Sequence, residues 1–507
     1  MSFPIVKRSL IAIILIALLV SPAGWTQTQL PAMGDGGEMT AGAERGLGER
    51  IVRELYRDPD YIDDPILGEY VQSIWQPLLK AARARGELPP ELDERFAWEI
   101  LLGRDGSVNA FALPGGYLGL HLGLIGVVAS RDELASVLAH ELTHVTQRHI
   151  SRLMTQQNRQ TPWLIGAMIL AALAASKNPE MANAAVMGGQ AIAAQNQLNF
   201  SRDMEREADR IGYVVMTQAG FDSRGFVTMF EKLQQASRLT DNGSFPYLRS
   251  HPLTTERIAD MQARQALEGR AAAVSEPVME HALLAARARV LSYPGVDLLR
   301  AWVAEPEATG FARLSASRQA AILYAAALAA ERLREGRKAA TLANRLLTLT
   351  GDNPAASRQA RLLAAEIALS AGDIARAAGL LNSAAPSSPL GRPELLMLAQ
   401  ARTRSGQPAQ AVDLLQTWVS THPRDAAAWQ ALAVAYRAQD QTLRAIRAEG
   451  EVQMAVYDFG GAVDRFKAAR VVMGKGNLGP ADHIEASIID TRLRLAESLL
   501  REQALQR

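Results

Sequence analysis

The 507-residue sequence contains no cysteine. This absence excludes disulfide bonds, a thiolate zinc site, a cysteine nucleophile and a lipidated cysteine. Neither sign of charge is in excess, since 54 Lys and Arg residues balance 53 Asp and Glu residues. A near-neutral chain without a basic stripe gives no electrostatic reason to expect a nucleic-acid partner. Aromatic residues make up only 6% of the chain, and the abundance of Ala, Leu and Arg favours helices.

Long apolar runs are also missing. The N-terminal run covers only residues 10–20, which is too short for a stable transmembrane helix. Two basic residues precede this run and the small residues Ser21 and Ala23 follow it, so we expect residues 1–23 to be a cleaved signal peptide. An uncleaved membrane anchor is the alternative. The polar, Gly-rich residues 24–42 predict a flexible leader.

The motif His-Glu-Leu-Thr-His occupies residues 140–144, inside a segment that we expect to be helical from about Arg131 to Asn158. Histidines four residues apart lie on the same side of a helix, so His140 and His144 can bind one metal ion. Zinc suits two neutral imidazoles and, with a third protein ligand, keeps one position open for water. Glu141 is then the candidate general base. The alternative is a solvated helix whose two histidines meet by accident.

A second helix is expected to begin near Ser201. Glu205 and Asp209 are four residues apart and share one side of that helix, whereas Glu207 turns away from them. This spacing predicts Glu205 as the third zinc ligand and Asp209 as the acceptor that orients a metal-binding imidazole through its other ring nitrogen. The alternative is an exposed helix start on which arginines and glutamates pair.

Together the two motifs resemble the M48 zinc metallopeptidases, in which HExxH is followed about sixty residues later by E-x-x-A-D. Residues 109–117 resemble the N-A-F-A-x-P-G-G strand and turn of that family, and Ser250-His251-Pro252, followed by Arg257, resembles the S-H-P segment of its periplasmic members. The resemblance covers roughly residues 40–270. It implies an α+β zincin-like peptidase domain, mostly helical with a small sheet, that holds one Zn²⁺ per chain in the periplasm. We place this domain at residues 43–270.

Extended segments are expected over residues 96–102, 108–113 and 117–122, which would form the small sheet. In zinc peptidases of this shape an edge strand holds the substrate backbone by β-addition. The candidate strand immediately precedes a Pro-Gly-Gly turn and contains Asn109, Ala110, Phe111 and Ala112. An ordinary core hairpin is the alternative.

His251 has two candidate roles. On the loop before Pro252 it could occupy the open position of the zinc as a fourth ligand and hold the enzyme off, which the family resemblance favours. Considered alone, a loop histidine is more often a hydrogen-bonding group or a group that stabilises the transition state. His149, five residues after His144, lies about 140° further round the expected helix and should not reach the metal.

Residues 163–195 lie between the two metal-bearing helices and predict a helical hairpin. Its first arm is too short to cross a membrane but long enough to lie against one as a peripheral contact. The alternative is a hairpin packed on its own protein.

The C-terminal part repeats with a period of 34 residues. Gly372, Gly406 and Asp440 are 34 residues apart, as are Ala377, Ala411 and Ala445. This is the period of tetratricopeptide repeats, whose helix pairs stack into a solenoid with a concave binding surface. We therefore expect an all-α tetratricopeptide solenoid at residues 317–507, joined to the peptidase domain by connecting helices over residues 271–316.

These features predict a periplasmic zinc endopeptidase whose repeats recruit protein clients. The family resemblance implies that the clients are unfolded or misassembled outer-membrane β-barrel proteins, met at the β-barrel assembly machinery through the repeat domain. It also implies that the enzyme degrades these clients and assists their assembly. The alternative function is a chaperone or adaptor of outer-membrane assembly with a largely latent peptidase site.

Overall fold

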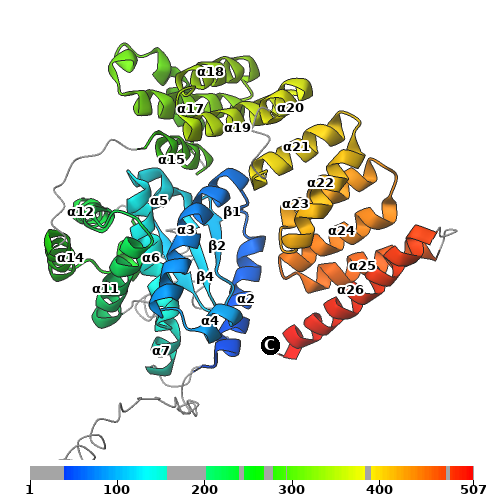
Figure 1. The fold of residues 1–507 in the computed structure, drawn as a ribbon, viewed down its shortest axis with the longest axis horizontal. Coiled ribbons are helices and arrows are strands. Elements are labelled where there is room, and N and C mark those ends of the chain that lie inside the picture. The colour runs from blue at the N-terminus through cyan, green and yellow to red at the C-terminus, as the bar shows by residue number, and fades with distance from the viewer. Residues whose placement is uncertain are drawn as a thin grey trace, which may run out of the picture. The chain divides into compact units, whose positions relative to one another are not determined.

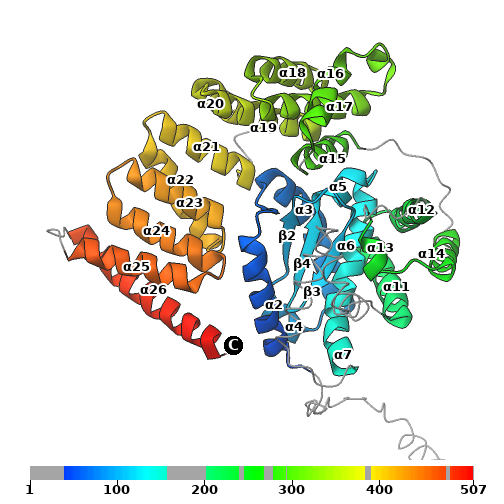
Figure 2. The ribbon, with the colours of Figure 1, turned by 180° about the vertical axis from the view of Figure 1, so that it is seen from behind.

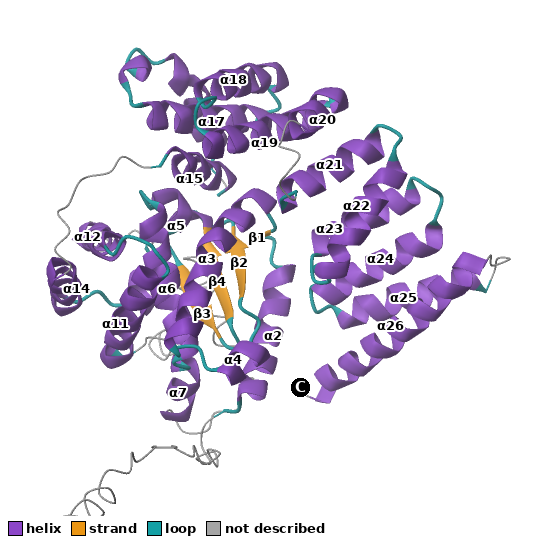
Figure 3. Ribbon diagram, in the orientation of Figure 1, coloured by secondary structure: helices purple, strands orange, loops and turns teal. Residues whose placement is uncertain are grey.

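The structure is a computed structural model that describes residues 39–156, 201–238, 245–267, 278–292, 294–382, 390–474 and 480–505. The expected signal peptide, most of the leader and the expected hairpin at 163–195 lie outside the described residues. Within those ranges, no helix is long and apolar enough to cross a membrane. The described part is mostly helical with one small sheet near its N-terminal end (Figure 3), which confirms the expected fold class.

The sheet has four strands in the order β1-β2-β4-β3. The strands are β1 (Tyr61–Ile62), β2 (Glu99–Gly103), β3 (Ala110–Leu113) and β4 (Tyr117–His121). β2 and β4 are parallel, while β1 pairs antiparallel with β2 and β3 pairs antiparallel with β4. In the β3–β4 pair, Phe111 lies opposite Gly119, where a Cβ atom would come within 2.1 Å of the phenyl ring. β3 is thus packed closely against β4, and the strand order places it at the edge of the described sheet.

Besides this sheet, the described part of the peptidase region contains ten helices. They are α2 (Ala41–Arg57), α3 (Pro65–Arg85), α4 (Pro90–Arg95), α5 (Leu122–Val127), α6 (Arg131–Thr146), α7 (His149–Gln156), α11 (Arg202–Gln218), α12 (Arg224–Arg238), α13 (Tyr247–Ser250) and α14 (Thr255–Leu267). α6 is almost wholly buried, because it packs on β3, α3, α11 and α12. Figures 1 and 2 show the strands between α2 and α6.

Side-chain caps fix where the two motif-bearing helices begin. The Ser130 hydroxyl accepts from the Glu133 N–H at the start of α6, and the Ser201 hydroxyl accepts from the Met204 N–H at the start of α11. Such caps satisfy backbone donors that have no partner within the helix. They fix the residue at which each helix begins and therefore the direction in which its motif residues point. Both motifs point toward the same site.

The expectation of one helix from 131 to 158 is wrong. α6 ends at Thr146, and α7 begins at His149 after Arg148 adopts the left-handed conformation with φ 51°. The Arg148 guanidinium donates to the buried Glu44 carboxylate at 3.0 Å, and Glu44 lies on α2. A long-range ion pair thus stabilises a bend that the local sequence, without Gly or Pro, does not signal.

The C-terminal part consists of consecutive helices that pack on their neighbours. They are α15 (Met279–Leu291), α16 (Val296–Ala304), α17 (Ala316–Arg332), α18 (Gly336–Leu349), α19 (Pro354–Ala371), α20 (Ile374–Asn382), α21 (Arg392–Arg404), α22 (Pro408–Thr421), α23 (Ala426–Arg437), α24 (Thr442–Ala455), α25 (Phe459–Met473) and α26 (Pro480–Leu505), with short 3₁₀ turns at Glu305–Glu307 and Phe311–Arg313.

The 34-residue period has a direct structural basis. Gly372, Gly406 and Asp440 each adopt positive φ, of 82°, 78° and 59°, at the turn between two helices. The alanines that repeat with the same period, Ala377, Ala411 and Ala445, are fully buried where helices approach closely. These features confirm tetratricopeptide repeats at the C-terminus.

Ion pairs and hydrogen bonds link the repeats to the peptidase region. The Arg392 guanidinium, which pairs within the repeats with Asp425 at 2.8 Å, contacts Asp63 of the peptidase region at 2.6 Å, and the hydroxyls of Tyr117 and Tyr457 are 2.6 Å apart. A cleft of about 730 Å³ lies beside these contacts, lined by α3, β2 and α22 among others. On its wall, the rings of Trp418 and His422 stack at 3.9 Å.

Candidate active site

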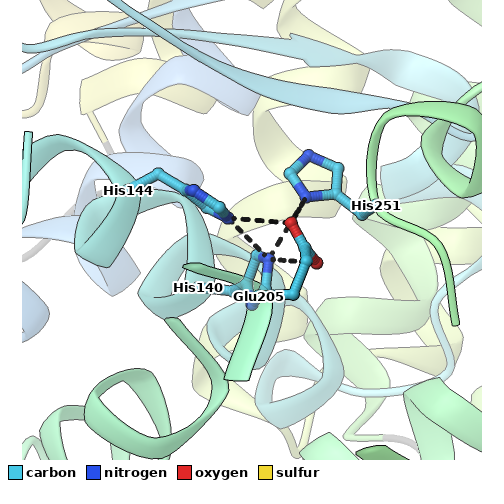
Figure 4. A group of neighbouring side chains, drawn as sticks. All are labelled: His140, His144, Glu205 and His251. Atoms are coloured by element: carbon cyan, nitrogen blue, oxygen red, sulfur yellow. Dashed lines mark hydrogen bonds and ion pairs between the residues drawn. The ribbon is translucent and has the colours of Figure 1, made fainter. Parts of the chain in front are cut away.

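Three elements bring the predicted site residues together. α6 provides His140, Glu141 and His144, α11 provides Glu205, and His251 directly follows α13. None of these five side chains is more than 2% exposed. Figure 4 shows the two α6 histidines, Glu205 and His251 pointing toward one another.

The potential ligand atoms of four residues, His140, His144, Glu205 and His251, lie within 4.8 Å of one another. Nε2 of His140 is 3.0 Å from Nε2 of His144 and 3.3 Å from Nδ1 of His251. Oε1 of Glu205 is 3.4 Å from Nε2 of His144 and 3.0 Å from Nδ1 of His251. Among the described residues this is the only group of its kind.

The chemistry of these four side chains fits a zinc ion. Ligands about 2.1 Å from a tetrahedral zinc are separated from one another by roughly 3.4 Å, close to the distances above. Three imidazole nitrogens also converge here with one carboxylate, and nitrogen lone pairs facing each other at this range repel unless a proton or cation lies between them. The predicted ligand set is thus assembled as the spacing of the motifs indicates.

His140 is held from behind by a carboxylate. Its Nδ1 is 3.0 Å from Oδ1 of Asp209, and the Arg257 guanidinium donates two hydrogen bonds to Asp209, at 2.6 and 2.8 Å. Burial raises the pKa of the Asp209 carboxyl, but the neighbouring Arg257 and His140 lower it by more. The pKa of Asp209 therefore falls below its ordinary value. Burial likewise disfavours the cationic form of His140, yet the hydrogen bonds to Asp209 and Glu205 raise its pKa to about 9. Asp209 therefore lies where an orienting acceptor is expected.

Arg257 does more than pair with Asp209. Its guanidinium lies 2.7 Å from Oε2 of Glu205 and donates to the carbonyl of Pro252 at 2.9 Å. One buried cation thereby holds Glu205 and Asp209 of α11 together with the loop of His251. Sequence reasoning noted Arg257 only as part of the family pattern, because its partner Asp209 lies 48 residues earlier in the chain.

Glu141 occupies the same pocket without belonging to the ligand group. Its Oε1 is 3.4 Å from Nε2 of His251, and the ring of Tyr247 stacks on the His251 imidazole at 4.5 Å. Burial raises the pKa of Glu141, while the nearby His251 and His140 oppose that rise. A carboxyl with a raised pKa is suited to both accepting and returning a proton. Tyr247 is a further residue of the site, and no motif in the sequence indicates it.

His149 and Glu207 lie behind His144, on the side away from the ligand group. Nδ1 of His149 is 2.9 Å from Nδ1 of His144, and its Nε2 is 3.1 Å from Oε2 of Glu207. Burial lowers the pKa of His149 to about 4, although Glu207 opposes the change. His149 does not join the ligands, as expected, but the bend at Arg148 brings it against one of them.

The candidate substrate strand borders α6, the helix that carries the motif. Ala110 and Ala112 of β3 are buried, and Phe111 is partly buried with its ring edge-on to His121. Asn109, just before β3, is 6% exposed, and its Oδ1 has no hydrogen-bond partner within the described residues. The strand is thus at the sheet edge, and its role in substrate binding stays a prediction.

Comparison with known families matches residues 68–265 to a family described as "Peptidase family M48" and residues 392–435 to "Tetratricopeptide repeat". The chain is 30% identical over 455 residues to the "Beta-barrel assembly-enhancing protease" of Escherichia coli (strain K12), covering 88% of each chain. It is 35% identical over 332 residues to the "Putative beta-barrel assembly-enhancing protease" of Vibrio cholerae, a match that spans 64% of each chain, less than two thirds of that relative's length. The "Mitochondrial metalloendopeptidase OMA1" of Arabidopsis thaliana is 33% identical over 164 residues, covering 32% of this chain and 31% of its own.

Proposed function

The chain belongs to the family of β-barrel assembly-enhancing proteases, metallopeptidases of family M48 with C-terminal tetratricopeptide repeats, and we propose that it is a periplasmic zinc endopeptidase. Its substrates would be misassembled outer-membrane β-barrel proteins, which it degrades and whose assembly it also assists. The names of its relatives support a role in outer-membrane protein assembly.

One observation carries the catalytic part of this proposal. His140, His144, Glu205 and His251 converge in a pocket from which water is nearly excluded, with Glu141 beside them. Burying so many polar side chains costs folding free energy unless they are paired or coordinate a metal. A buried cluster of this composition is therefore best explained as a metal-binding catalytic site.

The proposed chemistry divides between the metal and the chain. His140, His144 and Glu205 would hold the zinc, which when bound polarises a water molecule and the scissile carbonyl. Glu141 accepts the proton of the attacking water and returns it to the amine leaving group. β3 holds the substrate backbone as an added strand, since its outer edge belongs to no other strand of the described sheet.

Replacement of Glu141 tests whether peptide hydrolysis is the function. Glu141→Gln keeps the shape of the side chain but removes the base, so we expect bound zinc to remain and cleavage of unfolded casein to fall by about 10²–10⁴-fold. Glu133→Gln is the matched control, because Glu133 is a buried glutamate of the same helix that pairs with Lys232 at 2.7 Å instead. Complete retention of outer-membrane integrity in cells with Glu141→Gln would favour the adaptor function.

The repeats are proposed to recruit clients and to contact the β-barrel assembly machinery. The cleft between α3, β2 and α22 supports this, because it opens between the two regions and presents the stacked Trp418 and His422. Trp418→Ala should reduce client processing in cells while leaving cleavage of a short model peptide unchanged. Trp302→Ala is the control, since Trp302 is a partly buried tryptophan of α16 that does not line the cleft. Equal client processing by both variants would place recruitment elsewhere.

A further inference from the structure

The bend after α6 places a second imidazole against the metal-binding His144. The Nδ1 atoms of His144 and His149 are 2.9 Å apart, and the His149 side chain is fully buried. On its other side, Nε2 of His149 is 3.1 Å from Oε2 of Glu207, and Arg152 contacts that same oxygen at 2.8 Å. The four side chains form a continuous chain from the ligand group to the protein surface.

This contact exists because the backbone is held in an uncommon conformation. In an uninterrupted helix His149 would lie about 140° round the axis from His144. Arg148 at φ 51° ends that helix, and its guanidinium is held by Glu44 at 3.0 Å and Ser151 at 3.3 Å. Non-glycine residues in this region are uncommon and often lie at functional sites. Here the bend produces the His144–His149 contact.

The direction of the hydrogen bonds follows from the metal-binding role of His144. Its Nε2 faces His140 and Glu205, so this nitrogen must present its lone pair and the proton must reside on Nδ1. Nδ1–H then donates to Nδ1 of His149, so the single ring proton of neutral His149 resides on Nε2. That N–H donates to the Glu207 carboxylate, so this pattern of protons satisfies the contacts of His144 and His149 described above.

We propose that His149 is a positioning residue that fixes the tautomer and ring orientation of His144, with Glu207 fixing His149 in turn. The inference rests on the proposed metal site and assigns a support to its second histidine. The two ligand histidines are then held differently, since His140 has the carboxylate of Asp209 behind it and His144 has a neutral imidazole. Such supporting groups typically contribute 10–100-fold to metal affinity.

His149→Phe tests the proposal, because phenylalanine keeps a ring of similar size but cannot accept the hydrogen bond. We expect zinc affinity, measured by competition with a chromophoric chelator, to fall about 10–100-fold. With Co²⁺ in place of zinc, the visible absorption spectrum should also change, since it reports the geometry of the ligands. Glu207→Leu should lower zinc affinity by less, because His149 remains.

The matched control is His281→Phe. His281 is also a buried, doubly hydrogen-bonded histidine, with contacts to Tyr70 at 2.6 Å and to the Val128 carbonyl at 2.9 Å, but it is no part of the ligand group. Its substitution should leave zinc affinity unchanged. Equal losses in His281→Phe and His149→Phe would overturn the proposal, as would unchanged affinity in both His149→Phe and Glu207→Leu.

Two further measurements keep the outcome decisive. If His149→Phe fails to fold, Glu207→Leu decides alone, because Glu207 is partly exposed and its loss leaves the core intact; unchanged zinc affinity and an unchanged Co²⁺ spectrum would then overturn the proposal. Zinc binding by the unaltered protein and its loss in His144→Ala test the metal site itself. A protein that binds no zinc at all would refute the proposed function, which is a different result from an ineffective substitution at His149.

Discussion

In the peptidase region, α6 and α11 turn titratable side chains toward one another, whereas the helices of the repeat region turn alanine and leucine inward. The pocket of His140, Glu141, His144, Glu205 and His251 is sealed by other protein groups. In the repeats, a buried carboxylate such as Glu451 pairs with one arginine, Arg492, that is itself partly exposed.

The difference shows which part of the chain is organised for stability and which for chemistry. Aliphatic packing at about 25 cal/mol per Å² favours folding wherever it occurs. A buried polar cluster gains stability only when all its members are satisfied, and removing one member leaves the others uncompensated. Substitutions at the buried polar site should therefore change metal binding and catalysis, while those in the apolar core of the repeats should change stability alone.

The largest effect is expected from loss of a predicted ligand. His140→Ala, His144→Ala or Glu205→Ala should each remove most of the bound zinc, because a site that has lost one of these three ligands binds the ion too weakly. Atomic absorption on dialysed protein measures the zinc content. Near-stoichiometric zinc in His144→Ala would contradict the assignment.

The next effect concerns His251, which touches both Glu205 and Glu141. If it is a fourth ligand that excludes water, His251→Ala should raise cleavage of an unfolded substrate without loss of zinc, and we expect this result. If it stabilises the transition state instead, the rate should fall by about 10²–10³-fold with zinc retained. One assay of casein cleavage together with zinc content separates the two roles.

A smaller effect is expected at Asp209. Asp209→Ala removes the acceptor behind His140 and leaves Arg257 buried without its main partner, so zinc affinity or activity should fall by about 10–100-fold. Chelator competition measures the affinity. Asp203→Ala on the exposed side of the same helix should have no effect, and an equally silent Asp209→Ala would leave Asp209 a purely structural residue.

The smallest effect on the site is expected from the repeat core. Leu432 is fully buried in α23, so Leu432→Ala should destabilise the surrounding repeats by about 2–5 kcal/mol. Zinc affinity and cleavage of a short peptide should not change. Val434→Ala, on the exposed side of the same helix, controls for the loss of volume, and thermal unfolding monitored by circular dichroism measures both. Weaker zinc binding by Leu432→Ala would contradict the proposal that the repeat core affects stability but not the metal site.

The features that could be predicted from the sequence depend on local spacing. Four-residue separations place His140 with His144 and Glu205 with Asp209, and the 34-residue period gives the repeat turns. The features that were missed depend on distant partners. β1 has two residues, too few for a pattern, and the bend at Arg148 is stabilised by Glu44, 104 residues earlier. The contacts of Arg257 and His149 follow from tertiary packing for the same reason.

The apolar core of the peptidase region does not end where the peptidase region ends. One continuous apolar core extends from Ala41 in α2 to Ala401 in α21, and a buried ion pair between Asp64 and Arg287 lies within that part of the chain. Most of the buried residues from α22 onward belong to separate clusters. Under heat or mechanical load, the first repeat helices should therefore unfold together with the peptidase region as one cooperative unit. The last repeats contact the peptidase region through Tyr457 and Phe459, which pack with Leu47 and Tyr117, so they should open at a lower free energy than the shared core but not independently of it.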